Sequence, residues 1–227
     1  DGYIIKIVFK KDSNTLNRDL LEEMTQYEFV KDLDQLRESK SEKIGYLTYK
    51  EEPPKKIDGR KPALEDITSS SLEKMESFGK PFFMMIEGSQ IDWGGHANET
   101  NYVITEFQEF NLTVQKVLDY AKADGNTLVI VTADHGITFE LGENKRSKIN
   151  VQNPATLEDI YRVPLFIKYP DQVAGEINDC AASPVDILPT VIAATGIDAG
   201  WSVDGADLKS SCPERTSRTI VWPKGEF

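Results

Sequence analysis

Two patterns of apolar residues alternate along the chain. In the first, apolar side chains recur every three or four positions, which is typical of a helix with one buried face. This spacing predicts helices over residues 16–37 and 62–79, from Asn98 or Thr100 to Lys122, and over residues 186–194. In the second, short runs rich in β-branched, aromatic and other apolar residues predict strands at residues 3–9, 43–48, 81–86, 127–132 and 163–168.

The alternation of strands and helices defines the expected fold class. The last three strand candidates are apolar on both faces, as in a sheet that is covered on both sides. We therefore expect an α/β fold with a mainly parallel central sheet flanked by helices on both faces. A length of 227 residues fits one domain, so residues 1–227 are expected to form a single unit. The stripe expected to face the core from the longest helix is Val103, Phe107, Phe110, Val114, Val117, Leu118 and Ala121.

The charge balance excludes several function classes. Lys and Arg number 26 against 38 Asp and Glu, a net charge of −12. Without a basic excess, we expect no nucleic-acid partner and no attraction to an anionic membrane surface. Every apolar run is far shorter than the roughly 20 residues that cross a bilayer. Cys180 and Cys212 allow one disulfide in an oxidising compartment, and a start at Asp1 without Met or a signal sequence predicts a processed or incomplete chain.

Acidic and imidazole side chains follow two of the predicted strands. Glu87, Asp92 and His96 come after the first, and Asp134 and His135 directly follow the second. Because ligands bind beyond the carboxyl ends of strands in open α/β sheets, these five side chains are expected to converge. Carboxylates and imidazoles brought together in this way favour a bound cation, zinc for the mixed nitrogen and oxygen donors and magnesium for an oxygen-rich neighbour.

A simpler interpretation of the later pair is also open. An isolated Asp-His after a strand is more often a hydrogen-bonded loop pair than a metal site. The chain has only two histidines, however, and both lie near acids at predicted strand exits. This placement favours a metal site over coincidence.

The two segments that contain these residues resemble the alkaline phosphatase family. The strings that carry the resemblance are Phe82-Phe83-Met84-Met85-Ile86-Glu87-Gly88-Ser89-Gln90-Ile91-Asp92-Trp93-Gly94-Gly95-His96 and Gly125-Asn126-Thr127-Leu128-Val129-Ile130-Val131-Thr132-Ala133-Asp134-His135, and a weaker match extends back to Ile44. The resemblance implies that Glu87 binds magnesium, that Asp92 and His96 hold one zinc, and that Asp134 and His135 lie at a second zinc. It also implies a small phosphate-ester substrate, a periplasmic or extracellular location and, since members are often dimers, a homodimer.

Three later segments are similar to the sulfatase branch of the same superfamily. They are Ile160-Tyr161-Arg162-Val163-Pro164-Leu165-Phe166, Pro184-Val185-Asp186-Ile187-Leu188-Pro189-Thr190 and Val203-Asp204-Gly205-Ala206-Asp207-Leu208. The Asp-His-Gly string at residues 134–136 fits both branches. The chain therefore resembles phosphatases before this string and sulfatases after it. Natural divergence, a chimera and an uncertain sequence assignment are all open as explanations of this mixed resemblance.

Two elements of the alkaline phosphatase pattern are missing. No Asp-Ser-Ala string supplies the family's serine nucleophile, so we expect the chain to lack the N-terminal part that bears it. No third histidine is left to complete the first zinc site, although Glu158 or Asp159 offers an oxygen instead.

The sequence thus predicts a metal-dependent phosphomonoester hydrolase of the alkaline phosphatase type, represented by a portion with the metal ligands. The alternatives are a sulfatase-like or phosphodiester hydrolase with one divalent metal, and a non-catalytic metal-binding domain.

Overall fold

The computed structural model describes residues 23–49, 52–136 and 162–215. Its chain divides into two compact units, one of Asp1–Tyr120 with Val131–Leu165 and the other of Ala121–Ile130 with Phe166–Phe227. Each unit is described by itself. The predicted strand at residues 3–9 and the candidate ligands Glu158 and Asp159 lie outside the described residues.

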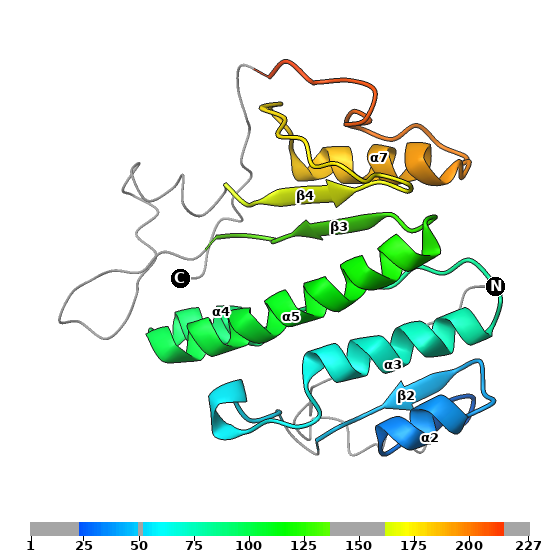
Figure 1. Ribbon diagram of the computed structural model, residues 1–227, viewed down its shortest axis with the longest axis vertical. Helices are drawn as coiled ribbons and strands as arrows, with labels where there is room; N and C mark the ends of the chain where they lie inside the picture. The colour runs from blue at the N-terminus through cyan, green and yellow to red at the C-terminus, as the bar shows by residue number, and fades with distance from the viewer. Residues whose placement is uncertain (1–22, 50–51, 137–161, 216–227) are drawn as a thin grey trace. The chain divides into compact units, whose positions relative to one another are not determined.

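The first unit begins with a small β-α-β arrangement (Figure 1). Strand β1 (Glu28–Val30) pairs in parallel with β2 (Ile44–Tyr46), and helix α2 (Leu33–Glu38) connects them. Asp32 begins α2 because its carboxylate accepts the backbone N–H of Gln35 at 2.8 Å. The core here consists of Val30, Leu36, Ile44, Tyr46 and Ile67.

The predicted helix over residues 16–37 is wrong within the described residues. A strand, β1, and a separate short helix, α2, occupy its second half. Phe29 and Val30 fit a strand as well as a helical stripe, and the capping side chain of Asp32 starts a new helix directly afterwards. The strand prediction at residues 43–48 is confirmed by β2.

Three further helices belong largely to the first unit: α3 (Leu64–Ser77), α4 (Gln90–His96) and α5 (Thr100–Asp124). The predicted helices over residues 62–79 and 100–122 are therefore confirmed. The predicted strand at residues 81–86 is wrong, because the structure assigns no strand there. No described segment pairs with its backbone, and a strand requires such a partner. The side chains of Phe83 and Met85 are consequently exposed.

The face of α5 that is buried also differs from the prediction. Phe107 belongs to the predicted apolar stripe and yet is 59% exposed. The buried positions of this helix include the polar side chains of Glu106, Glu109 and Thr113, together with Tyr102. Periodicity identified the helix and part of its buried face, since Ala121 is buried and the stripe residues other than Phe107 are partly buried. It did not identify the buried carboxylates, because their cationic partners lie far away in the sequence.

The strands β3 (Val129–Thr132) and β4 (Leu165–Lys168) form a second two-stranded sheet, which confirms the predictions at residues 127–132 and 163–168. A short 3-10 turn, η2 (Pro184–Asp186), leads into helix α7 (Ile187–Thr195), as predicted. Since the described residues contain two separate two-stranded sheets, the mainly parallel central sheet stays a prediction.

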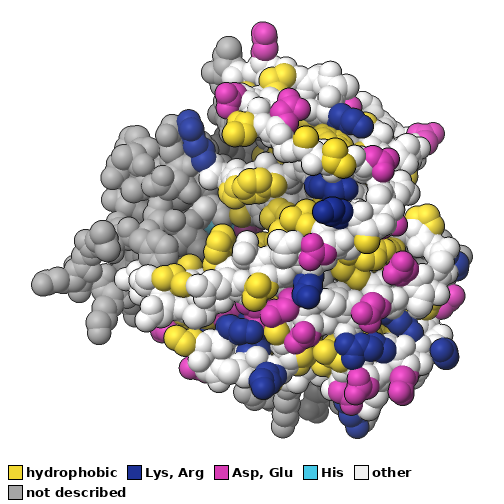
Figure 2. Space-filling view, viewed as in Figure 1, with side chains coloured by type: hydrophobic (Ala, Val, Ile, Leu, Met, Phe, Trp, Pro, Cys, Tyr) yellow, Lys and Arg dark blue, Asp and Glu magenta, His cyan; other side chains and the backbone are white. Residues whose placement is uncertain are grey.

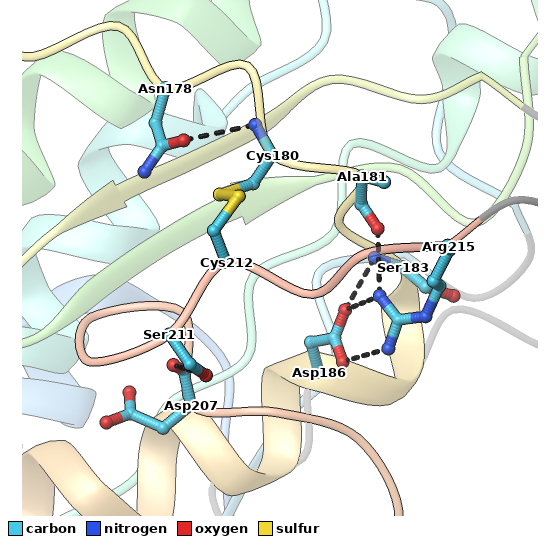
Figure 3. Close-up of a disulfide and its surroundings, with 9 residues drawn as sticks. All are labelled: Asn178, Cys180, Ala181, Ser183, Asp186, Asp207, Ser211, Cys212 and Arg215. Carbon is cyan, nitrogen blue, oxygen red and sulfur yellow. Dashed lines mark hydrogen bonds and ion pairs between the residues drawn. A yellow bond between two sulfur atoms is a disulfide. The ribbon is translucent and has the colours of Figure 1, made fainter.

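A disulfide and a buried ion pair hold the loops around α7 (Figure 3). Cys180 and Cys212 are bonded, as the cysteine count allowed. Asp186 is fully buried, and its two oxygens each lie 2.6 Å from a guanidinium nitrogen of Arg215. Burial acts to raise the pKa of the Asp186 carboxyl. Hydrogen bonds from Arg215 and from the backbone N–H groups of Ala206 and Ser183 outweigh that effect and hold this pKa below its ordinary value.

Charges of both signs share the described surface. In Figure 2, Lys and Arg side chains lie among Asp and Glu side chains over the visible face. No helix among the described residues is long and apolar enough to span a bilayer.

Candidate metal centre

Helix α4 presents the first pair of candidate ligands. Asp92 lies in its first turn and His96 in its last, four residues apart, so both side chains project from one face. His96 Nε2 lies 3.3 Å from Asp92 Oδ2. Asn98, which has a φ of 54°, follows shortly after the end of this seven-residue helix.

The second pair follows β3 directly. The backbone N–H of His135 donates to Asp134 Oδ1 at 3.0 Å, which is the loop hydrogen bond of the simpler interpretation. His135 Nδ1 lies 3.1 Å from the carbonyl oxygen of Gly136. A histidine whose Nδ1–H donates to a carbonyl has its Nε2 lone pair free for a metal. That Nε2 atom lies 3.8 Å from Asp134 Oδ2.

Asp92 joins the two pairs. Its Oδ1 atom lies 3.9 Å from His135 Nε2, while its Oδ2 atom faces His96. Four of the five predicted ligands are thus linked pairwise, although Asp92 and His135 are 43 residues apart in the sequence. Glu87 is exposed on the segment before α4 and, among the described residues, makes no ion pair with the other four.

The donor set suits a divalent cation in its chemistry, and one of its pairs also has a suitable spacing. Two ligands bound to one zinc at tetrahedral geometry lie roughly 3.3 Å apart. The Asp92–His96 pair shows this separation, at 3.3 Å, and the Asp134–His135 pair is wider, at 3.8 Å. In the described part of the chain, no three such side chains are yet close enough to enclose an ion. All four are also partly or largely exposed to solvent.

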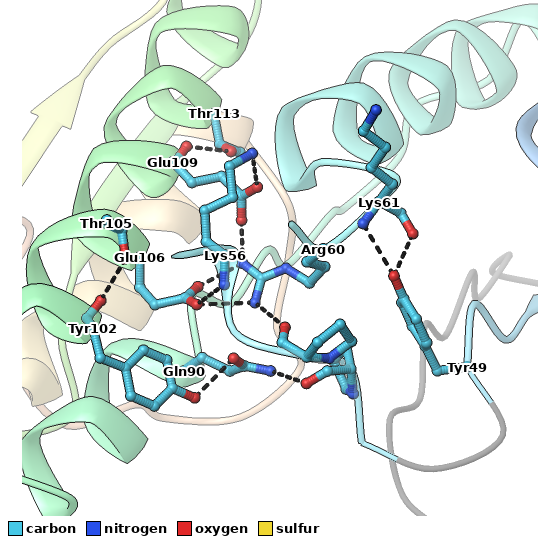
Figure 4. A network of polar contacts seen from close by, with 12 residues as sticks. Tyr49, Lys56, Arg60, Lys61, Gln90, Tyr102, Thr105, Glu106, Glu109 and Thr113 are labelled. Carbon is cyan, nitrogen blue, oxygen red and sulfur yellow. Dashed lines mark hydrogen bonds and ion pairs between the residues drawn. The ribbon is translucent and has the colours of Figure 1, made fainter. Parts of the chain in front are cut away.

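A buried polar network packs against the same part of the first unit (Figure 4). Arg60 donates to both Glu106 and Glu109, and Lys56 Nζ lies 2.6 Å from Glu109 Oε1. Burial acts to lower the pKa of the Arg60 guanidinium, but the hydrogen bonds that it donates to the two carboxylates, Glu106 and Glu109, outweigh burial and raise this pKa. The network was not predicted from the sequence. Its only sequence signal is a pair of acids, Glu106 and Glu109, at a spacing that places them on one face of a helix.

Fold and site together define an α/β protein with paired acid and imidazole groups after a strand and along a short helix. The chain belongs to the alkaline phosphatase family, whose model matches residues 8–183. Its fold is accordingly the α/β fold of alkaline phosphatases. The matched range includes the first of the three segments that resemble sulfatases.

Individual relatives agree with the family match. The chain is 35% identical over 130 residues to alkaline phosphatase 3 of Bacillus subtilis (strain 168), which is 56% of this chain and 28% of that protein. The solved alkaline phosphatase of the Antarctic bacterium TAB5 is 36% identical, with a TM-score of 0.50 over 55% of this chain and 38% of that one. A substituted form of the TAB5 protein, described with Mg bound in the M3 site, is 35% identical at the same TM-score, over 55% of this chain and 37% of that one. The match thus spans well under half the length of these relatives.

Proposed function

We propose that this chain carries the metal-binding part of a phosphomonoester hydrolase of the alkaline phosphatase type. The observation that supports the proposal best is the position of Asp92, whose two oxygens face the imidazoles of His96 and His135. All three side chains are partly exposed, so a cation could reach them from solvent. They are well suited to bind cations.

In this proposal each residue holds a defined ion. Asp92 and His96 bind one zinc, Asp134 and His135 bind a second, and Glu87 binds magnesium. When bound, a metal pair polarises the phosphoryl group and stabilises the charge of the attacking and leaving oxygens. The Gly136 carbonyl orients the His135 ring by accepting its Nδ1–H, so that Nε2 faces the site. For Trp93, which follows Asp92 in the sequence and is 36% exposed, the proposal offers a place beside the substrate phosphate, with a simple packing role as the alternative.

The same proposal implies a class of substrate, a central sheet, an oligomeric state and a cellular location. We expect a small phosphate ester as substrate, a mainly parallel central sheet in the whole fold, a homodimer, and a periplasmic or extracellular location. The Cys180–Cys212 disulfide supports that location, because disulfides persist in oxidising compartments.

The test combines metal analysis with hydrolysis assays. The purified chain is dialysed against zinc and magnesium, its metal content is measured by mass spectrometry, and an aryl phosphate and an aryl sulfate are offered at alkaline pH. Two zincs per chain support the proposal, and phosphate release in addition would show that this part of the enzyme is active by itself. One divalent ion with sulfate release supports the sulfatase-like alternative instead, and a chain without zinc contradicts the proposal.

Two variants make the ligand assignment testable. Asp134→Ala should lose zinc, whereas Asp204→Ala, which removes the same charge from an exposed loop of the other unit, should retain it. Equal zinc content in the two variants would contradict the assignment of Asp134 as a ligand.

A further inference from the structure

We infer that the hydrogen bond between Tyr102 and Gln90 is a positioning device for the metal centre, which fixes helix α4 and thereby Asp92 and His96. The inference rests on the proposed function in so far as Asp92 and His96 are metal ligands. It adds a role for two side chains that lie outside the ligand set.

The pair joins the starts of two consecutive helices. Gln90 is the first residue of α4 and Tyr102 lies in the first turn of α5, and each is only 5% exposed. The Tyr102 hydroxyl donates to Gln90 Oε1 at 2.8 Å. Gln90 Nε2 in turn donates to the backbone carbonyl of Pro53 at 2.9 Å. One side-chain amide therefore ties the start of α4 both to α5 and to the segment before η1 (Lys56–Asp58).

A close backbone approach supports this tie. A Cβ atom on Gly94 would lie 2.9 Å from Val103 Cγ2 and 3.0 Å from the Val103 backbone nitrogen, so only glycine allows α4 to lie this near to α5. Gly94 is placed between Asp92 and His96 in the helix. The helix is thus fixed at its first residue by a hydrogen bond and between its two ligands by direct contact.

The segment that receives the Gln90 amide is itself held in place. Arg60 Nη1 donates to the Pro54 carbonyl at 3.2 Å and to Glu106 Oε1 at 3.1 Å, and the Lys56 backbone N–H donates to Glu106 Oε1 at 2.7 Å. Polar contacts therefore run from α5 through this segment to Gln90 and back to α5 through Tyr102 (Figure 4). The start of α4 is fixed from two sides by groups that are themselves fixed.

The network matters because α4 is short. A helix of seven residues is not stable by itself, so its position depends on tertiary contacts. Loss of the Tyr102 hydroxyl leaves a buried amide oxygen on Gln90 without its donor. Burial first, and the charge of Glu106 second, raise the pKa of the Tyr102 phenol above its ordinary value.

The test is Tyr102→Phe in the full 227-residue chain, with Tyr49→Phe as a matched control. The Tyr49 hydroxyl makes two hydrogen bonds with the backbone of Lys61 and none with α4, so the control variant also loses a hydrogen-bonded hydroxyl but no hydrogen bond to that helix. Zinc affinity is measured by competition with a chelator, and amide hydrogen exchange is measured in the metal-free chain. We expect Tyr102→Phe to lower zinc affinity about tenfold and to accelerate exchange in α4 about tenfold relative to α3. The control should change neither.

The outcomes separate positioning from general stability and from the proposed function. Unchanged exchange in α4, or equal acceleration in α3 and α4, overturns the positioning role. If the unmodified chain binds no zinc, the ligand assignment fails by itself, and the exchange measurement still decides whether Tyr102 holds α4.

Discussion

Replacement of Arg60 by Met tests the buried ion network most severely. The guanidinium contacts two carboxylates whose side chains are only 4% exposed for Glu106 and 1% for Glu109, while the Arg60 side chain itself is 11% exposed. Met has a similar length and is apolar, so the substitution removes the charge and the donors with little change in packing volume.

The magnitude follows from what remains after the substitution. Lys56 still pairs with Glu109, and its backbone N–H still donates to Glu106. Among the described residues, Arg60 is the side-chain cation that pairs with Glu106, so the substitution leaves Glu106 a buried charge without a salt bridge. Breaking a buried pair in this way costs about 3–5 kcal/mol of unfolding free energy. Adding Glu106→Gln to Arg60→Met should recover part of the loss, since the carboxylate that remains is the one paired with Lys56.

The assay is urea unfolding followed by far-UV circular dichroism, which reports on α3 and α5. Lys55→Met is the matched control, because it removes one cation from the same segment and breaks a more exposed pair with Glu99. That ammonium also lies 4.5 Å from the Tyr102 ring centre, and its removal should cost about 1 kcal/mol. Equal losses in Arg60→Met and Lys55→Met would refute the reasoning.

Three further changes have defined outcomes. Gly94→Ala should lower the unfolding free energy by about 1–3 kcal/mol through overpacking, whereas Gly175→Ala, whose Cβ meets open space, should be neutral in the same thermal denaturation. Because the pKa of Asp186 is lowered on folding, its contribution is present above the ordinary value of 3.8 and lost as pH falls below it; acid unfolding with no such loss would contradict this. Replacing both Cys180 and Cys212 by Ser opens a loop closed over a separation of 32 residues and should cost about 3–4 kcal/mol, measured by urea unfolding against the oxidised chain.

Local patterns were sufficient to predict the long elements but not the pairing between strands. Helices α3 and α5 were predicted because a periodicity sustained over many residues has only one local explanation. The strand β1 was missed because Phe29 and Val30 satisfy two periodicities at once. The segment at residues 81–86 has the composition of a buried strand, yet whether it forms one depends on a neighbouring strand and not on its own residues.

The candidate site was predictable in part for a similar reason. Asp92, His96, Asp134 and His135 were expected to converge beyond the ends of two strands, and in the structure Asp92 faces both imidazoles while Asp134 lies near His135. Residues 81–86 form no strand, so the strand-exit reason holds only for Asp134 and His135, and the role of all four as metal ligands stays a prediction. The magnesium role of Glu87 and the single domain of residues 1–227 stay predictions. The contact between Arg60 and Glu106 joins residues 46 positions apart, so no local pattern indicates that the two acids of α5 are buried.

The most direct test of the central claim is the zinc affinity of the chain and of its Asp92→Asn variant, measured by isothermal titration. Within the described part of the chain, Asp92 is the side chain that faces both imidazoles, and an amide in its place removes the negative charge without changing its size. If the four residues form a metal centre, the unmodified chain binds zinc and the variant loses that binding. Equal zinc affinity in the two proteins, or none in either, would contradict the account.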